Sequence, residues 1–150
     1  MDCMAIPSPL GVLTLWAEEG ALVRLSFGPA APAGGETALL RRAAAELAEY
    51  FSGKRRVFDL PLAPAGTPFQ LDIWRALETI PYGQTRSYAQ LAALAGHGGA
   101  CRAAGTANGK NPLPILIPCH RVIRADGAPG GYAPGPEIKK FLLNLENRYA

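Results

Sequence analysis

Cys119 is the residue of this chain whose surroundings best suit covalent chemistry, because His120 and Arg121 follow it directly. A cysteine reacts as its thiolate, and a neighbouring base or positive charge increases the thiolate fraction. Side chains that are adjacent in sequence need not touch, however, and a buried structural cysteine beside a surface histidine explains the same residues. The tripeptide alone therefore leaves open a nucleophilic cysteine and a structural one.

The cysteines and histidines lie too far apart for the common alternatives to nucleophilic chemistry. The chain of 150 residues has three cysteines and two histidines, at Cys3, Cys101, Cys119, His97 and His120. It contains no C-x-x-C pair, and a structural zinc site needs four closely spaced ligands. Three separated cysteines do not suggest a disulfide framework either. We therefore expect no bound metal, and at least one free thiol in a reducing compartment.

The elements around Cys119 can be predicted from local patterns. Residues 115–117 are Ile-Leu-Ile, which predicts a buried segment that delivers the cysteine from the core. Residues 111–112, Asn-Pro, predict a turn before it, and the glycines of 127–135 predict a loop after it. Apolar residues at helical spacing predict a last helix over 137–148.

Three more helices are predicted upstream, over about 68–80, 88–95 and 100–108. The first two begin with a capping box, in which Thr67 precedes Gln70 and Ser87 precedes Gln90. A glycine turn joins the last two, as in a helix-turn-helix, although any pair of antiparallel helices fits this spacing. The second of them has a surface of mostly Ala, Gly and Thr with the single Arg102. Small residues let a helix approach a partner closely, which favours a helix that lies in a groove.

Residues 1–62 have a different pattern. Two strands around a Glu-Gly turn predict a hairpin, and a loop, a helix and a third strand follow. The hairpin strands are expected at 11–16 and 22–27, the loop at 28–35, the helix at 36–51 and the third strand at 57–60. Because residues 61–66 resemble a linker, we predict two domains, 1–62 and 63–150, in a protein of the α+β class.

Charge divides unevenly between the two parts. Residues 63–150 hold nine Lys and Arg against five Asp and Glu, whereas residues 1–62 hold six against seven. This asymmetry is compatible with nucleic-acid contact by the C-terminal part. No apolar run approaches the ~20 residues of a membrane helix, and the N-terminus lacks the features of a signal peptide. We therefore expect a soluble cytoplasmic protein with no membrane partner.

Residues 117–123, with the sequence IPCHRVI, resemble the active-site signature of the O6-methylguanine-DNA methyltransferase family. The resemblance extends over about residues 66–148, and residues 1–62 match in outline only. Its other segments are 66–70, 80–83, 85–88, 90–92, 102–103, 107–109 and 111–112. It implies a small ribonuclease H-like α/β domain followed by a helical domain of the winged-helix or helix-turn-helix type that binds DNA.

The family's activity implies a DNA repair function. The protein would flip O6-alkylguanine, and also O4-alkylthymine, out of double-stranded DNA and transfer the alkyl group irreversibly to Cys119. The resemblance implies a monomer that acts once per molecule. No cofactor is implied, since no motif for a methyl donor is found.

The resemblance also assigns roles near the thiol. Cys119 would accept the alkyl group, and His120 would act through a water as its base. Glu146 would orient and charge-balance His120, and Asn111 would brace the turns around the site. Taken alone, Glu146 reads as a solvated glutamate and Asn111 as a simple turn residue.

The same resemblance assigns residues to the DNA and the base. Arg102 would fill the space that the flipped nucleotide vacates. Tyr88 would crowd the phosphate and donate a proton toward guanine N3. Tyr132 would line the pocket, and backbone groups near Cys119 and Val122 would read the guanine edge. Without the resemblance, the tyrosines read as packing residues and Arg102 as a surface cation.

One segment departs from the family pattern. A Ser-Gly-Gly-like stretch often follows the pocket tyrosine, where this chain has Ala133, Pro134 and Gly135. The Ala133 N–H remains able to donate to guanine O6, but the serine hydroxyl is absent. Pro134 and Pro136 are expected to stiffen the loop. We expect this to affect the rate and the tolerance of bulky alkyl groups, rather than the reaction class.

Three other functions compete with this interpretation. A non-enzymatic lesion sensor of the alkyltransferase-like kind lacks the acceptor cysteine, which Cys119 supplies here. A sequence-specific winged-helix regulator needs base-edge donors that the predicted recognition helix lacks. A cysteine hydrolase needs an oxyanion hole and a peptide cleft, for which the sequence gives no support. Mass spectrometry after incubation with alkylated DNA separates all three from a methyl acceptor.

Overall fold

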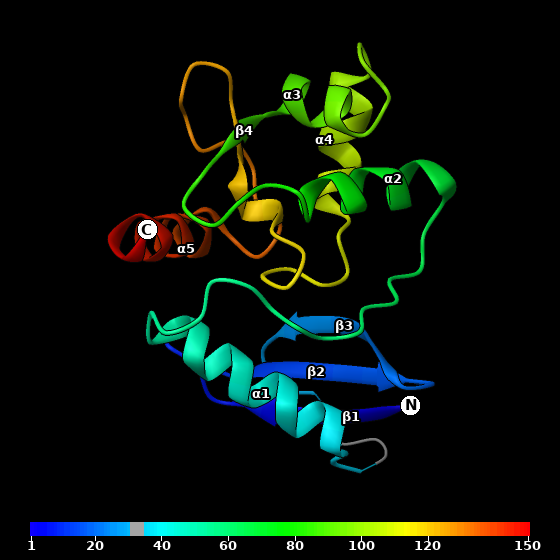
Figure 1. The fold of residues 1–150 in the computed structure, drawn as a ribbon, viewed down its shortest axis with the longest axis vertical. Helices are drawn as coiled ribbons and strands as arrows, with labels where there is room; N and C mark the ends of the chain where they lie inside the picture. Colours follow the sequence, from blue (N-terminus) through cyan, green and yellow to red (C-terminus); the bar gives the residue numbers. More distant parts are fainter. Residues whose placement is uncertain (31–34) are drawn as a thin grey trace. The chain divides into compact units, whose positions relative to one another are not determined.

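The computed structural model describes residues 1–30 and 35–150, so that most of the predicted loop 28–35 lies outside the described residues. The chain divides into two compact units, Met1–Ala65 and Gly66–Ala150. The first is a small sheet with one helix and the second is mainly helical, which confirms the predicted α+β class (Figure 1). None of the helices in the described part of the chain is long and apolar enough to cross a membrane.

The N-terminal unit is built on a three-stranded antiparallel sheet in the order β1-β2-β3. Its strands are β1 (Asp2–Ile6), β2 (Leu13–Glu18) and β3 (Ala21–Phe27). The predicted hairpin is confirmed, because β2 and β3 pair around Glu19 and Gly20 with both φ angles positive. A two-residue turn of this kind matches the twist of the strands. Strand β1 was not predicted from the sequence.

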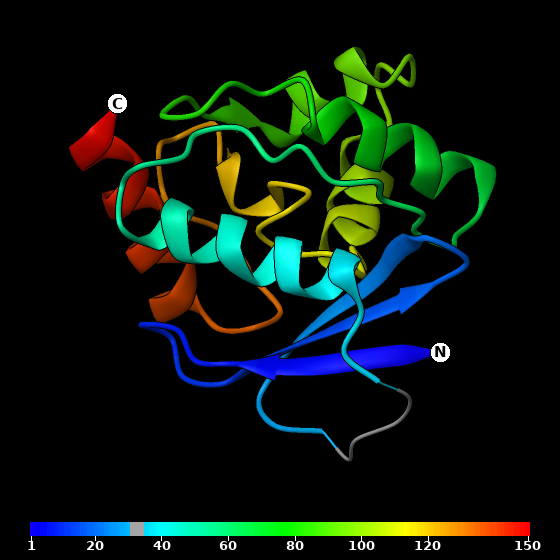
Figure 2. The same cartoon turned by 60° about the horizontal axis from the view of Figure 1, so that its bottom comes forward.

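Helix α1 (Ala38–Phe51) forms a second layer beside this sheet (Figure 2). Thr37 caps it, with its side chain accepting from the Leu40 N–H at 3.3 Å. Apolar side chains from the helix and from β2 and β3 are fully or almost fully buried, namely Leu13, Leu15, Leu22, Leu25, Leu40, Ala43, Leu47 and Tyr50. This core satisfies the helical and strand periodicities that the sequence predicts.

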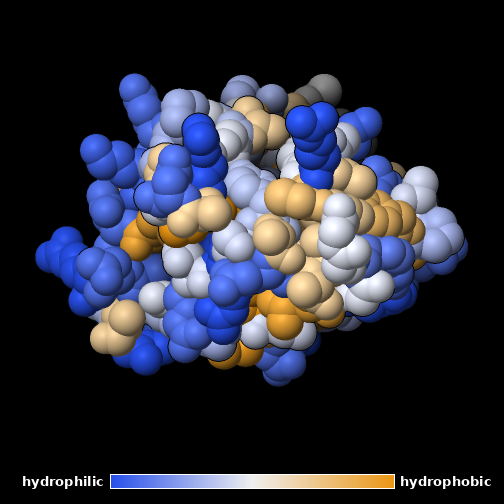
Figure 3. All heavy atoms as spheres, turned by 90° about the horizontal axis from the view of Figure 1, so that it is seen from above, coloured by the Kyte–Doolittle hydropathy of each residue, from blue (hydrophilic) through white to orange (hydrophobic). Residues whose placement is uncertain are grey.

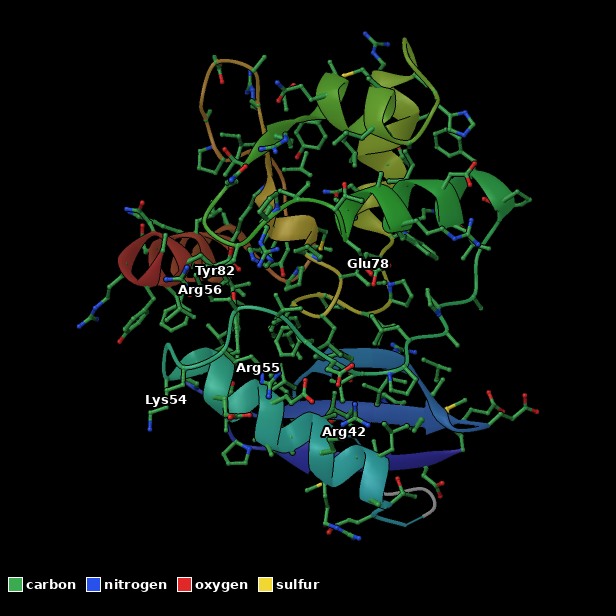
Figure 4. All side chains as sticks on the ribbon, in the orientation of Figure 1. Arg42, Lys54, Arg55, Arg56, Glu78 and Tyr82 are labelled. Atoms are coloured by element: carbon green, nitrogen blue, oxygen red, sulfur yellow. The ribbon has the colours of Figure 1, made fainter. Side chains whose placement is uncertain are left out.

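The strand predicted at 57–60 does not form. Side chains of α1 bind this segment instead: the Asp59 N–H donates to buried Glu46 at 2.8 Å, and Arg42 donates to the Asp59 carbonyl. Arg55, labelled with Arg42 in Figure 4, also lies 3.4 Å from Glu46. The segment joins the sheet at Leu62, which forms a bridge with Leu22 of β3. The prediction was wrong because strand propensity competes with these side-chain contacts.

The C-terminal unit begins with α2 (Pro68–Leu77), and α3 (Tyr88–Leu94) and α4 (Cys101–Gly109) pack against it. Both predicted capping boxes are present, at the starts of α2 and α3. The indole N–H of Trp74 on α2 donates to the Ala107 carbonyl on α4 at 2.9 Å. The α3–α4 pair therefore rests on α2 as a helix-turn-helix arrangement.

The remaining elements carry the acceptor segment. Two short strands, β4 (Arg86–Ser87) and β5 (Val122–Ile123), pair in parallel, and the 3-10 helix η1 (Cys119–Arg121) precedes β5. The last helix, α5 (Pro136–Tyr149), contacts η1. The sequence analysis did not predict β4, β5 or η1, because each is only two or three residues long.

Candidate active site

Cys119 lies at the start of η1, and only 4% of its surface is exposed. The segment before it is also buried, as predicted, and it contains Ile115 in the left-handed region at a φ of 74°. Such a conformation is a genuine outlier for a β-branched residue and costs on the order of 1–3 kcal/mol. The surrounding structure must therefore hold this strained backbone, which fixes how the chain enters Cys119.

The side chain of Asn111 forms hydrogen bonds across this strained turn. Its Nδ2 donates to the Ile117 carbonyl at 2.8 Å, and its Oδ1 accepts from the Leu113 N–H at 2.9 Å. On α4, Asn108 donates to the Cys119 carbonyl at 3.4 Å. The sequence predicted a role for Asn111 but none for Asn108, although residues 107–109 belong to the segments that carry the family resemblance.

The Cys119 thiol is protonated at neutral pH. Burial raises its pKa to about 11, and the Asn111 side chain and the charge of Lys139 offset only part of this effect. The thiol therefore needs a base before it can act as a nucleophile.

His120 is fully buried and faces Glu146 on α5, with 2.6 Å between Nε2 and Glu146 Oε2. Burial lowers the pKa of His120, although the Glu146 carboxylate opposes this shift. The imidazole is therefore neutral at rest, and donation from Nε2 to the carboxylate places the lone pair on Nδ1. Nδ1 is buried and has no hydrogen-bond partner among the described residues.

Arg121 completes a buried ionic network with Glu146. Its Nε and one terminal nitrogen lie 2.7 and 3.0 Å from the two carboxylate oxygens. The other terminal nitrogen donates to the Ile80 carbonyl at 2.7 Å, and the guanidinium lies 5.7 Å from the ring centre of Tyr82, labelled in Figure 4. Burial alone would raise the pKa of Glu146, but hydrogen bonds from His120 and Arg121 lower it to about 2.

The lowered pKa of Glu146 predicts that the protein loses stability in acid. Its folded pKa lies below the ordinary value of 4.5, so its contribution is complete above pH 4.5 and is lost as the pH falls toward 2. The full contribution is about 3 kcal/mol, because one pKa unit corresponds to ~1.4 kcal/mol. Urea unfolding across this range should show the difference between wild type and Glu146→Gln shrinking by that amount.

Glu137→Gln is the matched control, because Glu137 is exposed on the same helix. Its difference from wild type should not change across the same pH range. A gap between wild type and Glu146→Gln that stays constant with pH would show that Glu146 does not carry the acid dependence.

Lys139 on α5 is fully buried and was missed by the sequence analysis. Its ammonium donates to the Val122 carbonyl at 2.6 Å and to the Gly131 carbonyl at 3.2 Å. Burial lowers its pKa to about 8, whereas the nearby Cys119 opposes this shift. Lys139 shares the buried face of α5 with Leu142 and Glu146, so strict helical spacing was a signal that could have found it.

Two tyrosines lie next to the thiol. The Tyr132 hydroxyl is buried, and burial followed by the charge of Cys119 raises its pKa. Tyr88 fits beside two glycines: a Cβ on Gly130 would lie 2.7 Å from its hydroxyl, and one on Gly105 would lie 3.5 Å from its ring. Partial burial and then the nearby Cys119 also raise the pKa of Tyr88.

The structure does not bring all the predicted residues to the thiol. Val122 is fully buried directly after η1, whereas Ala133 is exposed in the loop before α5. Arg102 is exposed in the first turn of α4. The side of the unit that carries α3 and α4 shows a patch of apolar and weakly polar surface bordered by hydrophilic side chains (Figure 3).

Comparison with known proteins places both units in one family. Residues 1–64 match the family described as "6-O-methylguanine DNA methyltransferase, ribonuclease-like domain". Residues 68–148 match "6-O-methylguanine DNA methyltransferase, DNA binding domain".

Individual relatives agree with these matches. The methylated-DNA–protein-cysteine methyltransferase of Methanosarcina barkeri is 48% identical over 148 residues, which cover 94% of each chain. A constitutive protein of the same name from Bacillus subtilis is 55% identical over 74% of this chain and 68% of its own. The crystal structure of Mycobacterium tuberculosis OGT in complex with DNA has a TM-score of 0.90 at 42% identity, and covers 99% of this chain and 94% of that one.

Proposed function

Because this chain belongs to the 6-O-methylguanine DNA methyltransferase family, we propose that it is a methylated-DNA–protein-cysteine methyltransferase. Its substrate is duplex DNA that contains O6-alkylguanine, and its alkyl acceptor is Cys119. The observation that carries this assignment is a buried cysteine directly followed by a buried histidine, whose Nε2 lies 2.6 Å from Glu146 and whose Nδ1 is open.

The chemical step moves one proton and one alkyl group. The proton of the Cys119 thiol passes through a water to Nδ1 of His120, and Glu146 stabilises the imidazolium that forms. The thiolate then attacks the alkyl carbon, so that the C–S bond forms as the C–O6 bond breaks. The electron pair stays on guanine, which takes a proton at N3 from the Tyr88 hydroxyl. Tyr88 is reprotonated with the proton first taken from the thiol, so the products are a thioether and neutral guanine.

The open Nδ1 supports the bridging water in this step. A buried water needs polar partners, and the thiol and the imidazole nitrogen provide two. Glu146 cannot replace His120 as the base, because its low pKa of about 2 makes it a poor proton acceptor. Its role is to hold the imidazole by its Nε2 side.

The burial of Cys119 supports base flipping. A thiol on a residue that is 4% exposed cannot reach O6 of a guanine that is stacked in a duplex, so the nucleotide must leave the stack. The α3–α4 pair would lie against the DNA, and its small side chains allow close approach. Arg102 would enter the vacated space, and Tyr88 would crowd the phosphate of the flipped nucleotide.

The pocket for the base would be formed next to the thiol. Tyr132 would line it, and backbone groups near Cys119 and Val122 would read the guanine edge. Lys139 holds the Val122 and Gly131 carbonyls together, which supports a pocket of fixed width. Ala133 would offer its N–H to O6, and O4-alkylthymine would enter by the same route.

The two units would divide the work as the sequence predicts. All the proposed site residues belong to the domain at 63–150, whereas the domain at 1–62 supplies none of them. A complete acceptor network within one chain supports a monomer, and three free cysteines are compatible with the reducing cytoplasm. The alkyl group comes from the DNA itself, so no separate methyl donor is needed.

We expect one alkyl group per protein, carried on Cys119, after incubation with excess O6-methylguanine duplex. The reason is that a thioether is stable and the proposed site contains no group that could remove the alkyl group. Intact-protein mass spectrometry should show the gain of one methyl group, and peptide mapping should place it on Cys119. A duplex with unmodified guanine is the control. Methylation of Cys3 or Cys101, or turnover beyond one equivalent, would overturn the assignment.

A further inference from the structure

The turn between α3 and α4 is rich in glycine and leads into a helix without a side-chain cap. Three of its residues are glycines, and Gly96 and Gly99 have φ angles of 82° and 91°. Ala100, the N-cap of α4, makes no side-chain hydrogen bond to the helix. Glycines and a missing cap both leave the start of a helix with more freedom. Arg102 lies in this first turn of α4.

His97 connects this turn to α2. Its Nε2 lies 3.0 Å from Oδ2 of Asp72, and its ring meets the Phe69 ring edge-on with 4.7 Å between the centroids. Its backbone carbonyl accepts from the Ala100 N–H at 3.0 Å. His97 therefore connects two side chains of α2, Asp72 and Phe69, to Ala100, the N-cap of α4.

Stabilisation of the fold is a poor explanation for this contact. His97 and Asp72 have side chains that are 35% and 41% exposed, and pairs at such positions contribute little to stability. Positioning is the better explanation, because the contact acts at a glycine-rich turn directly before the helix that carries Arg102. We propose that Asp72, Phe69 and His97 form a tether that positions Arg102 for entry into the duplex. This inference rests on the proposed function, in which Arg102 fills the vacated space.

The test compares two substrates, one of which needs no base flipping. Single-turnover transfer is measured from O6-methylguanine duplex and from free O6-benzylguanine. His97→Ala should slow the duplex reaction by about tenfold, since misplacement of a reacting group by 1 Å can cost up to ~10²-fold. Transfer from the free base should stay within about twofold, because Arg102 takes no part in it. His97→Gln, which keeps an N–H donor, should recover most of the duplex rate.

Arg75→Ala is the matched control. Arg75 lies 3.4 Å from Oδ1 of the same Asp72 carboxylate, so this change removes an ion pair on α2 but leaves the tether intact. It should leave both reactions unchanged. In a double-mutant cycle, His97→Ala should add little to the loss already caused by Arg102→Ala, because both act through one side chain.

Three results would overturn the tether. They are a His97→Ala protein that repairs duplex DNA like wild type, equal losses on the two substrates, and fully additive losses with Arg102→Ala. Failure of the proposed function looks different, because wild-type protein would then transfer no alkyl group from either substrate. Thermal unfolding of each variant shows that the rates are measured on folded protein.

Discussion

Replacing Cys119 with alanine is expected to abolish alkyl transfer while leaving binding to O6-methylguanine duplex largely intact. The Cys119 thiol is the proposed acceptor of the alkyl group, and neither of the other cysteines has a comparable setting. Cys101 is exposed on α4, and Cys3 is buried in β1 of the other unit. Neither of them is followed by a histidine in the sequence.

Binding should survive because the acceptor is a small part of the contact surface. Phosphate contacts supply much of the affinity of a protein for DNA, and the loss of one buried thiol removes none of them. Fluorescence anisotropy at a fixed salt concentration measures the affinity, and mass spectrometry measures transfer. Cys101→Ala is the matched control and should keep full transfer. Loss of DNA affinity in a folded Cys119→Ala protein would contradict the assignment.

Replacing Arg102 with alanine is expected to slow repair of duplex DNA by on the order of 10²-fold, because unstacking a base costs a few kcal/mol. Transfer from free O6-benzylguanine, where no base is flipped, should barely change. Arg102 is exposed, so its removal should alter stability by no more than ~0.5 kcal/mol. Lys110→Ala, which removes an exposed cation at the other end of α4, is the matched control for lost charge.

Glu146→Gln should lack this selectivity and slow both substrates. The amide would hold His120 less well as a base, and general-base contributions are typically ~10²–10⁴-fold. Because the change also leaves buried Arg121 without its carboxylate, His120→Gln provides a second variant that keeps the Arg121–Glu146 pair.

Equal losses on duplex and free base for Arg102→Ala would contradict its role in base flipping. Rates unaffected by both network variants would exclude His120 as the base.

Local chemistry explains which parts of the fold could be predicted. Capping boxes at Thr67 and Ser87, the turn at Glu19 and Gly20, and the periodicity of α1 and α5 are patterns within a few residues. Their hydrogen bonds form between near neighbours, so the sequence alone contains the partners. The missed strand β1 and the wrong strand at 57–60 depend instead on distant segments.

The same distinction applies to the site. The resemblance around Cys119 identified the thiol, His120 and Glu146 as one group, but it could not give their protonation states. Adjacency of a histidine left open an activated thiolate and a structural cysteine, whereas the structure gives a buried thiol with a pKa of about 11. Lys139 was missed because a lysine on an amphipathic helix is ordinarily solvated; its helical spacing could have indicated burial, but only the structure shows its two carbonyl partners.

The sequence by itself therefore determined the family resemblance and most of the helices and suggested the acceptor, because these depend on residue types and short spacings. Tertiary structure decided what each titratable group can do. His120 meets Glu146 across 26 positions of sequence, and Arg121 meets the Ile80 carbonyl across 41. A pKa depends on burial and on charges within a few ångströms, and those neighbours are set by packing rather than by position along the chain.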